Sequence, residues 1–522
     1  MFTLNDLFRW RADLHPTAIA LVDDRDDQAT YGELHDRSLR CAARWQARGV
    51  TKGDVVALLD TNSVAYLVQM LGLSRIGAIP ALMNWRLTAT ENEGVFDLIR
   101  PRAVVANPAL INRLPAQLPD LLVSLHEEKA LSSTDAAGSL HRTSTVWEVE
   151  DETKAPDIEL PLSPLATDTF ALAFSSGTTG LPKGIPWRHE SLARAAMVDG
   201  AGIAGMSLGD RHLLVAPMFH LAGFSNGLMG LARGSEVHLR TSFNPEGMLD
   251  DIEALAINYM TVVPAMFRAL VQTAKQRPFP PDTSSMLEMT YGASPIAPDL
   301  VREVQELFPN TGLRQFYGMT EVAGALTSLT PADHLDSEHS QSAGRVTPGF
   351  EVRLVDRAGD QVPDGMPGQI MVRSTAIMTG YWENPDATAE VMIDGWFATG
   401  DIATRKEGYL TMMDRAKDMI VTGGENVYPA EVEAVLYAHP DIRDAAVIGV
   451  PDDAFGERVH AVVVGDADLE LEAVQTFCRQ QLAGYKLPRS LTLVAELPRN
   501  ATGKILKRDL RAPFWEGHKH KV

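Results

Sequence analysis

The sequence predicts an α/β protein of more than one domain. Short apolar runs alternate with helical patterns through the first 125 residues, as expected where helices cover buried parallel strands. At 522 residues the chain is longer than one hydrophobic core usually organises. From about residue 350 the pattern changes to hairpin-like strands separated by Gly, Asp and Pro turns, which indicates a second kind of architecture.

Composition excludes several classes of function. The chain has 47 basic and 68 acidic side chains, and its net charge of -21 disfavours a broad surface for nucleic acid or anionic lipid. Cys41 and Cys478 are the two cysteines of the sequence, too few for a disulfide framework or a metal cluster. This cysteine content suits a reducing cytoplasm, where we expect the protein to be located.

No targeting or membrane segment is expected. Residues 1–11 carry charge within every apolar run, unlike a signal peptide, and they predict an amphipathic helix capped by Thr3. The most apolar stretch, Val55–Leu73, is interrupted by Asp60 and by polar residues 61–63. We therefore expect a protein without an integral membrane segment.

The first part of the chain reads as strands and helices in alternation. The pattern predicts buried strands at 18–22, 55–59 and 103–106 and helices at 31–48 and 64–76. Segment 77–88 is interpreted as structural. Residues 127–167 have little periodicity and are interpreted as a surface excursion.

A glycine-rich segment then follows the apolar strand 169–173. Residues 174–184 read Phe-Ser-Ser-Gly-Thr-Thr-Gly-Leu-Pro-Lys-Gly. Glycine tolerates positive φ and lets amides converge, hydroxyl side chains donate hydrogen bonds, and the lysine adds a mobile positive charge. These features predict a phosphate-binding loop. It is not a Walker loop, because the Gly-x-x-x-x-Gly-Lys-Ser/Thr spacing is absent.

The next strands end in polar and glycine-rich segments. A strand at 211–220 leads into the glycine-spaced stretch 221–230, where the glycines have two open explanations, helix packing or an acyl channel. Strands at 287–290 and 313–316, which follow one at 259–263, run into Tyr291–Pro295 and Tyr317–Glu321. Ligands of α/β sheets bind outside the carboxyl ends of strands, so both segments are candidate site elements.

The C-terminal part carries further turn motifs. Strands are expected at 352–355 and 369–372, and Asp394–Asp401 follows them. A helix at 430–437 and a strand at 444–450 come after the Gly-Gly-Glu-Asn-Val-Tyr-Pro run of 423–429. Lys504 stands in a glycine-containing turn, and the His-Lys tail 518–521 is interpreted as a frayed terminus rather than a metal tract.

The 174–184 run resembles, nearly letter for letter, the phosphate loop of the adenylate-forming superfamily, which includes acyl-CoA synthetases, peptide-synthetase adenylation domains and luciferases. Motifs similar to that family follow in family order up to Lys504 and cover essentially the whole chain. The resemblance implies a large N-terminal domain of packed mixed sheets with helices, residues 1–414, which holds the acyl and ATP sites. It also implies a small mobile α+β C-terminal domain, residues 415–522.

The same resemblance implies the site residues. The candidate catalytic residues are Lys504, Glu321, Thr178 and His220, and Glu321 and Thr178 are the candidate magnesium ligands. The candidate residues for binding nucleotide and coenzyme A are Ser175, Ser176, Gly177, Thr179, Gly180, Lys183, Gly292, Ala293, Ser294, Gln315, Phe316, Tyr317, Gly318, Met319, Thr320, Asp401, Arg415, Lys417, Gly423 and Gly424.

Each implied role suits its chemistry. Tyr317 would stack on adenine, Thr320 would bind the α-phosphate and the Asp401 carboxylate would accept from both ribose hydroxyls. Arg415 would contact the nucleotide, and Lys417 would be the pivot of the mobile domain. Gly423 and Gly424 would line a pantetheine channel, and Lys504 would touch the substrate carboxylate.

The resemblance implies ATP-dependent, magnesium-dependent activation of a carboxylic acid and transfer of the acyl group to coenzyme A. His220 stands where amino-acid-activating relatives carry aspartate, which argues for a simple carboxylic acid. A fatty acid is favoured because small residues suggest a roomy apolar pocket; the small residues are Gly223, Gly227, Gly324 and Ala325. The alternatives are an aryl or alicyclic acid, transfer to a carrier protein, and a noncatalytic binding homologue.

The expected state is a monomer or homodimer without a nucleic-acid partner. One departure from the family pattern is Pro186-Trp187-Arg188, where Trp187 adds bulk after the phosphate loop and puts the local loop shape in doubt.

Overall fold

The computed structural model describes residues 2–119, 121–124, 146–149, 164–175, 182–199, 207–294, 296–466, 469–499 and 505–516. The chain forms two compact units. The first comprises Met1–Glu351 with Arg373–Gly395, and the second comprises Val352–Val372 with Trp396–Val522. The boundary expected between residues 414 and 415 is the start of the proposed mobile C-terminal domain. That boundary stays a prediction.

The first unit contains a seven-stranded sheet in the order β7-β6-β5-β3-β4-β8-β9. Neighbouring strands are parallel up to β8, and β9 runs antiparallel to β8. The bounds are β3 Val55–Leu59, β4 Ile79–Leu82, β5 Ala103–Ala106, β6 Leu121–Ser124, β7 Val146–Val149, β8 Thr169–Ser175 and β9 Lys183–Arg188. Strands β3, β4 and β5 are fully buried, which explains their continuous apolar sequences.

A second sheet of this unit follows the order β16-β15-β14-β13-β12-β10-β11-β1-β2. The run from β14 to β1 is parallel, and β15, β16 and β2 add antiparallel pairs at the ends. The bounds are β1 Ile19–Val22, β2 Gln28–Thr30, β10 Arg211–Leu214, β11 Glu236–Leu239, β12 Tyr259–Val262, β13 Glu288–Gly292, β14 Gly312–Met319, β15 Gly324–Leu329 and β16 Arg345–Val346. The short strand β19 is Met392–Ile393.

Several helices of the first unit begin at capping residues that the sequence offers. Thr3, Thr30 and Thr88 form capping boxes, in which the threonine and the acidic residue three positions on bond each other's backbone. The bounds are α1 Leu4–Leu14, α2 Tyr31–Ala47, α3 Val64–Arg75, α4 Ala89–Ile99, α5 His189–Arg194, α6 Leu221–Arg233, α7 Pro245–Ala254, α8 Pro264–Gln276, α9 Pro298–Leu307 and α10 Pro385–Val391. The cap expected at Thr3 is therefore confirmed.

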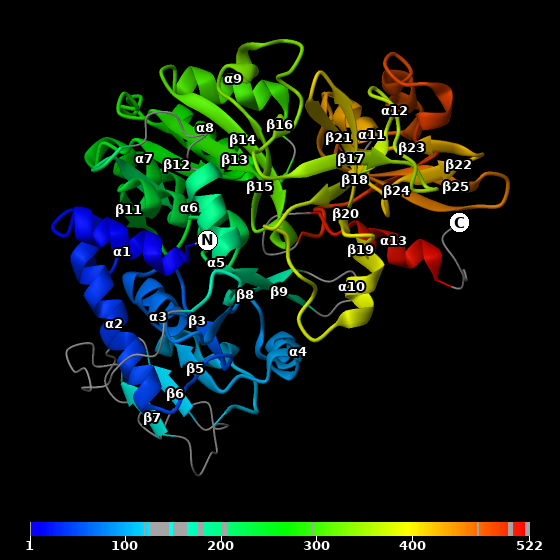
Figure 1. Cartoon of the computed structure of the whole chain (residues 1–522). Helices are drawn as coiled ribbons and strands as arrows, with labels where there is room; N and C mark the ends of the chain where they lie inside the picture. The colour runs from blue at the N-terminus through cyan, green and yellow to red at the C-terminus, as the bar shows by residue number, and fades with distance from the viewer. Residues whose placement is uncertain are drawn as a thin grey trace. The chain divides into compact units, whose positions relative to one another are not determined.

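One core of this unit lies between the second sheet and the helices α7, α8 and α9, which cover one face of β12 and β13 in Figure 1. Leu249 of α7, Phe267 of α8 and Val304 of α9 pack with Met260 and Met289 of the strands, and all five side chains are completely buried or nearly so. This packing gives β12, β13 and β14 a rigid support, and the carboxyl ends of β13 and β14 carry two of the predicted site segments.

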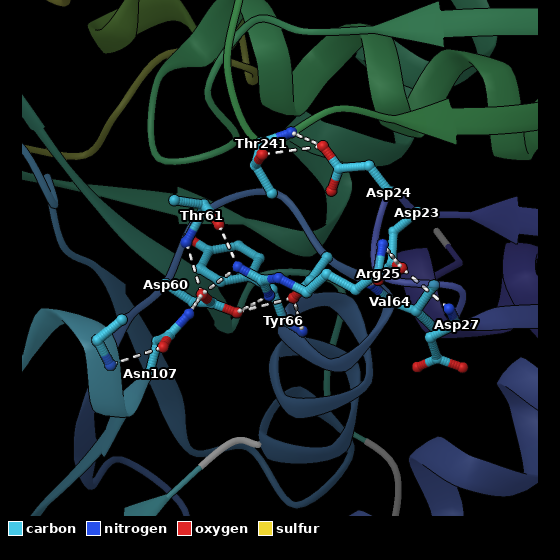
Figure 2. A network of polar contacts seen from close by, with 12 residues as sticks. Asp23, Asp24, Arg25, Asp27, Asp60, Thr61, Val64, Tyr66, Asn107 and Thr241 are labelled. Atoms are coloured by element: carbon cyan, nitrogen blue, oxygen red, sulfur yellow. Dashed lines mark hydrogen bonds and ion pairs between the residues drawn. The ribbon is translucent and has the colours of Figure 1, made fainter. Parts of the chain in front are cut away.

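A buried polar network ties the two sheets of the first unit together (Figure 2). Asp60, which follows β3, accepts hydrogen bonds from the Arg25 guanidinium at 3.3 Å and from the Asn107 amide at 2.7 Å. Asp23, which follows β1, accepts from the first backbone N–H of α3 at 3.0 Å. Because buried carboxylates need such partners, this network fixes how the strand ends of the two sheets meet.

The second unit begins with the neighbouring strands β17 Glu351–Val355, β18 Gly368–Arg373, β20 Trp396–Lys406 and β21 Tyr409–Arg415. Strand β20 runs antiparallel to both β18 and β21. The C-terminal sheet of this unit has the order β23-β22-β25-β24 with β26 beside β25. The bounds are β22 Ile420–Thr422, β23 Glu425–Val427, β24 Ile442–Asp452, β25 Gly456–Gly465, β26 Ser490–Leu493, α11 Pro429–Tyr437, α12 Leu471–Cys478 and α13 Lys507–Trp515. Helices α11 and α12 pack in one core and α13 in another.

The remaining single-turn and irregular helices are Pro108–Arg113, Ala195–Asp199, Thr320–Val322, Asp333–Leu335 and Gly484–Lys486. The predicted strands and helices all form within a few residues of their expected bounds, except that 215–220 is a loop after β10 rather than strand. Of the surface excursion expected at 127–167, most lies outside the described residues, and 146–149 forms strand β7. None of the described helices is both long and apolar enough to cross a bilayer.

Candidate active site

The carboxyl ends of β13 and β14 bring two predicted site segments side by side. The strands are parallel neighbours, and Gly292 is the register partner of Phe316. A Cβ on Gly292 would lie 2.3 Å from the Phe316 carbonyl oxygen, so the close approach requires glycine. Ala293 follows with φ +68°. The segment that begins at Gly292 therefore starts beside the Gln315–Phe316 part of β14.

Strand β14 then turns into the short helix Thr320–Val322, which carries Glu321. The carboxylate is buried, and its Oε1 accepts a hydrogen bond from the Tyr381 hydroxyl at 3.2 Å. The Glu321 carbonyl oxygen accepts from the backbone N–H of Met378 at 2.9 Å. A buried carboxylate at the edge of the sheet is a hard oxygen ligand, which suits Mg²⁺.

The phosphate-loop segment is bounded by the β8–β9 hairpin. Ser175 and Lys183 are register partners at the open end of the pair. Lys183 Nζ lies 4.3 Å from the centroid of the Tyr381 ring. Five of the predicted residues, Ser176, Gly177, Thr178, Thr179 and Gly180, lie outside the described residues. Their roles stay predictions.

Trp187, which adds bulk after the phosphate loop, packs beside the turn that carries Glu321. It is completely buried, its ring lies 4.9 Å from Phe224 of α6, and its indole N–H donates to the Thr320 carbonyl oxygen at 2.8 Å. The residue thus connects β9 to the turn that carries Glu321. Sequence reasoning missed this contact, although a buried indole N–H usually requires an acceptor.

His220 caps the N-terminus of α6, where its Nδ1 accepts the backbone N–H of Ala222 at 3.4 Å. Burial and the nearby Arg86 guanidinium lower the pKa of His220, so the imidazole is neutral at physiological pH. Arg86 stacks on Trp85, and Trp85 lies edge-on to Phe219. The segment 77–88, interpreted as structural, therefore brings Trp85 and Arg86 beside the expected substrate region.

The glycines of α6 face protein. Added Cβ atoms would lie 2.3 Å from the Pro217 carbonyl oxygen at Gly223, 3.1 Å from Leu214 at Gly227 and 2.8 Å from the His212 ring at Gly230. These contacts support helix packing, the first of the two explanations left open by the sequence. They provide no room for an acyl chain on this face of the helix.

Space beside Gly324 is likewise filled. Asp199 accepts the backbone N–H of Ala325 at 3.0 Å, and a Cβ on Gly324 would lie 2.7 Å from the same carboxylate oxygen. Arg194 pairs with Asp199 at 3.3 Å. Burial nevertheless raises the pKa of Asp199 to about 6.

The second unit holds the other predicted nucleotide residues. Asp401 in β20 is buried and pairs with Arg415 Nε of β21 at 3.2 Å. Lys417 follows, and burial lowers its pKa. Gly423 and Gly424 form the β22–β23 turn with φ of +60° and +87°. Lys504 lies outside the described residues, so its role stays a prediction.

Replacing Trp187 by Phe removes the donor to the Thr320 carbonyl oxygen. We expect the free energy of unfolding to fall by about 1–3 kcal/mol, the cost of a buried acceptor without its partner. Urea titration followed by far-UV circular dichroism measures this change. Trp10→Phe is the matched control, because Trp10 is 48% exposed. Equal midpoints for the two variants would contradict the contact.

Asp199 should make the stability depend on pH. Its folded pKa of about 6 exceeds the ordinary value of 3.8, so its protonated form stabilises the fold. That contribution, about 3 kcal/mol at most from a shift of about two pH units, is complete below about pH 4 and is lost as pH rises through 6. Asp199→Asn should flatten the unfolding free energy over this range. A variant with the wild-type slope would refute the assignment.

Two family models match this chain. Residues 8–382 match the family model "AMP-binding enzyme", and residues 431–504 match "AMP-binding enzyme C-terminal domain". The chain is 33% identical to a fatty acid–[acyl-carrier-protein] ligase of Streptomyces coeruleorubidus over 100% of this chain and 98% of that protein. It is 36% identical to a feruloyl-CoA synthase of an Amycolatopsis species over 97% of each chain.

Among solved structures, the o-succinylbenzoate coenzyme A synthetase of Bacillus subtilis, in complex with ATP and magnesium ion, matches with a TM-score of 0.81. That match covers 97% of this chain and 98% of the other at 27% identity. The predicted fold class and the prediction of an enzyme are confirmed. The chain belongs to the AMP-binding enzyme family of the adenylate-forming superfamily, as its phosphate-loop sequence predicts.

Proposed function

We propose that this enzyme uses ATP to activate a hydrophobic carboxylic acid as its acyl-adenylate and then transfers the acyl group to coenzyme A. The observation that carries the proposal is the Glu321 carboxylate, buried at the carboxyl edge of the sheet and bonded to the same tyrosine that lies under Lys183. Glu321 as a metal ligand and Lys183 as a phosphate-binding cation would thus both face the polyphosphate chain of ATP.

Magnesium fits this arrangement. Among the described residues, no three His, Cys, Asp or Glu side chains gather into a metal site of their own. Mg²⁺ commonly binds through one or two carboxylates together with substrate phosphates, which matches a single buried Glu321. Thr178 is the second proposed ligand. The bound ion would neutralise charge on the phosphates of ATP.

In the first half-reaction, an oxygen of the acid attacks the α-phosphorus, and the bond from that phosphorus to the pyrophosphate oxygen breaks. This chain needs no side-chain nucleophile. Its residues orient the two anions and offset their repulsion. We assign Lys183 to the phosphates, Tyr317 to the adenine, and Thr320 to the α-phosphate. Asp401 would accept from the ribose hydroxyls, with Arg415 beside it.

In the second half-reaction, the thiolate of coenzyme A attacks the acyl carbon, and the bond from that carbon to the AMP oxygen breaks. The thiol proton leaves to solvent. We place the pantetheine arm along the turn of Gly423 and Gly424, because these two residues carry no Cβ and their positive φ values favour glycine. Rotation at Lys417 would let the C-terminal domain serve both halves in turn.

A second candidate acceptor is the thiol of a carrier protein. It is favoured by the fatty acid–[acyl-carrier-protein] ligase that is 33% identical to this chain. The feruloyl-CoA synthase at 36% identity favours coenzyme A. The feruloyl relative also supports an aromatic acid as the alternative to a fatty acid, because the packed α6 glycines remove one argument for a long acyl channel.

A panel of acids tests the proposed function. The enzyme with ATP, Mg²⁺ and coenzyme A should form AMP and acyl-CoA with at least one fatty or aromatic acid and with no amino acid. AMP and thioester are measured together by chromatography, and a carrier protein replaces coenzyme A in a parallel series. The absence of AMP and pyrophosphate with every acid and acceptor would refute an acid-activating enzyme and favour a noncatalytic homologue.

Replacing Lys504 by Ala should slow adenylate formation by about 10²-fold or more, the scale of a lost preorganised charge contact. Thioester formation from supplied acyl-adenylate should be largely preserved, because the lysine acts in the first half-reaction. Single-turnover assays of each half separate the two effects. Lys275→Ala, at an exposed ion pair with Glu303, is the control. Equal losses in both halves would contradict this division of roles.

A further inference from the structure

Tyr381 lies at the centre of the first unit's candidate site, although no sequence motif pointed to it. The hydroxyl donates to Glu321 Oε1 at 3.2 Å, and the face of the ring carries the Lys183 ammonium at 4.3 Å from its centroid. One side chain therefore contacts both the proposed metal ligand and the proposed phosphate-binding lysine. A cation over an aromatic face and a hydroxyl on a carboxylate are both stabilising contacts.

The chain around Tyr381 is fixed from several directions. The backbone N–H of Met378 donates to the Glu321 carbonyl oxygen at 2.9 Å, and that of Trp382 donates to the Gly184 carbonyl oxygen at 2.8 Å. The backbone N–H of Tyr381 itself donates to Thr388 Oγ1 at 2.9 Å. These bonds attach the segment to both the Glu321 turn and the β9 strand.

The approach of this segment to β9 depends on a glycine. A Cβ on Gly184 would lie 2.9 Å from the Cβ of Trp382, closer than real Cβ contacts. Trp382 packs against the core of the seven-stranded sheet. Gly184, the last residue of the phosphate-loop motif, therefore lets the chain next to Tyr381 approach strand β9.

The direction of the bond follows from the two groups. The phenol of Tyr381 carries the proton and donates, and the Glu321 carboxylate accepts. The bond fixes the rotation of the Glu321 carboxylate about its terminal torsion.

We propose that Tyr381 is a positioning residue that sets the Glu321 carboxylate relative to Lys183, so that both can engage one metal-bound polyphosphate. This inference rests on the proposed function and deepens it. Residues that bond a metal ligand from outside usually change metal affinity by about 10- to 100-fold when they are removed. The hydroxyl would affect metal binding through the Glu321 carboxylate, and the ring would hold the Lys183 ammonium in place.

Two variants separate these actions. Tyr381→Phe removes the hydroxyl and keeps the ring under Lys183, whereas Tyr381→Leu removes both. Binding of Mn²⁺ in the presence of a non-hydrolysable ATP analogue, followed by electron paramagnetic resonance, reports metal affinity without any acid or thiol. Binding of the same analogue without metal, followed by calorimetry, reports the phosphate contact. Tyr31→Phe, which removes a buried hydroxyl bonded to two carbonyl oxygens elsewhere, is the matched control.

Tyr381→Phe should weaken Mn²⁺ binding by about 10-fold and leave metal-free nucleotide binding unchanged. Tyr381→Leu should weaken both, and Tyr31→Phe should weaken neither. A wild-type Mn²⁺ affinity in Tyr381→Phe would overturn the inference, and so would equal losses of metal-bound and metal-free nucleotide. These results remain readable if no acid is activated, because the binding assays do not depend on the proposed reaction.

Discussion

The turn that carries Glu321 depends on hydrogen bonds from segments far away in the sequence. Trp187 donates to the Thr320 carbonyl oxygen, Met378 donates to the Glu321 carbonyl oxygen, and Tyr381 donates to the Glu321 carboxylate. Loss of a partner from a buried polar group costs about 1–3 kcal/mol. The carboxylate can therefore keep its buried position only while the β9 strand and the 378–382 segment stay in place.

This constraint gives a structural role to Trp187, which departs from the family pattern after the phosphate loop. Trp187 fills space beside Phe224 and supplies a donor at the same time. Gly184 lets Trp382 approach without a clash, and Tyr381 next to it reaches the site. Trp187 and Tyr381 thus both support the turn that carries Glu321.

Much of the fold could be predicted from the sequence because it is specified locally. Capping at Thr3 and the continuous apolar runs of β3 and β5 depend on neighbours a few residues away, and the structure has them where expected. The carboxyl ends of β13 and β14 could be proposed as a candidate site from their glycines and polar residues, and that assignment stays a prediction. The strand predicted at 211–220 is shorter in the structure, because its pairing with the neighbouring strands stops at Leu214.

The rest could not be predicted, because it depends on tertiary contacts. A glycine row on α6 fits both a channel and a packed helix, and only the atoms of β10 and Pro217 decide between them. Tyr381 has no spacing that marks it as a partner of Glu321, 60 residues away, and Trp187 has none that marks it as a partner of Thr320, 133 residues away. The signals that could have helped were a buried indole N–H and a phenol, both of which need a hydrogen-bond partner.

The central claim is that Glu321 is the protein's carboxylate ligand for metal-bound nucleotide. A crystal structure of the enzyme with Mg²⁺ and a non-hydrolysable ATP analogue tests it most directly. The account predicts a magnesium ion about 2.0–2.1 Å from a Glu321 carboxylate oxygen, with the Tyr381 hydroxyl still bonded to that carboxylate. A metal–nucleotide complex bound by other residues, with Glu321 making no contact to it, would contradict the account.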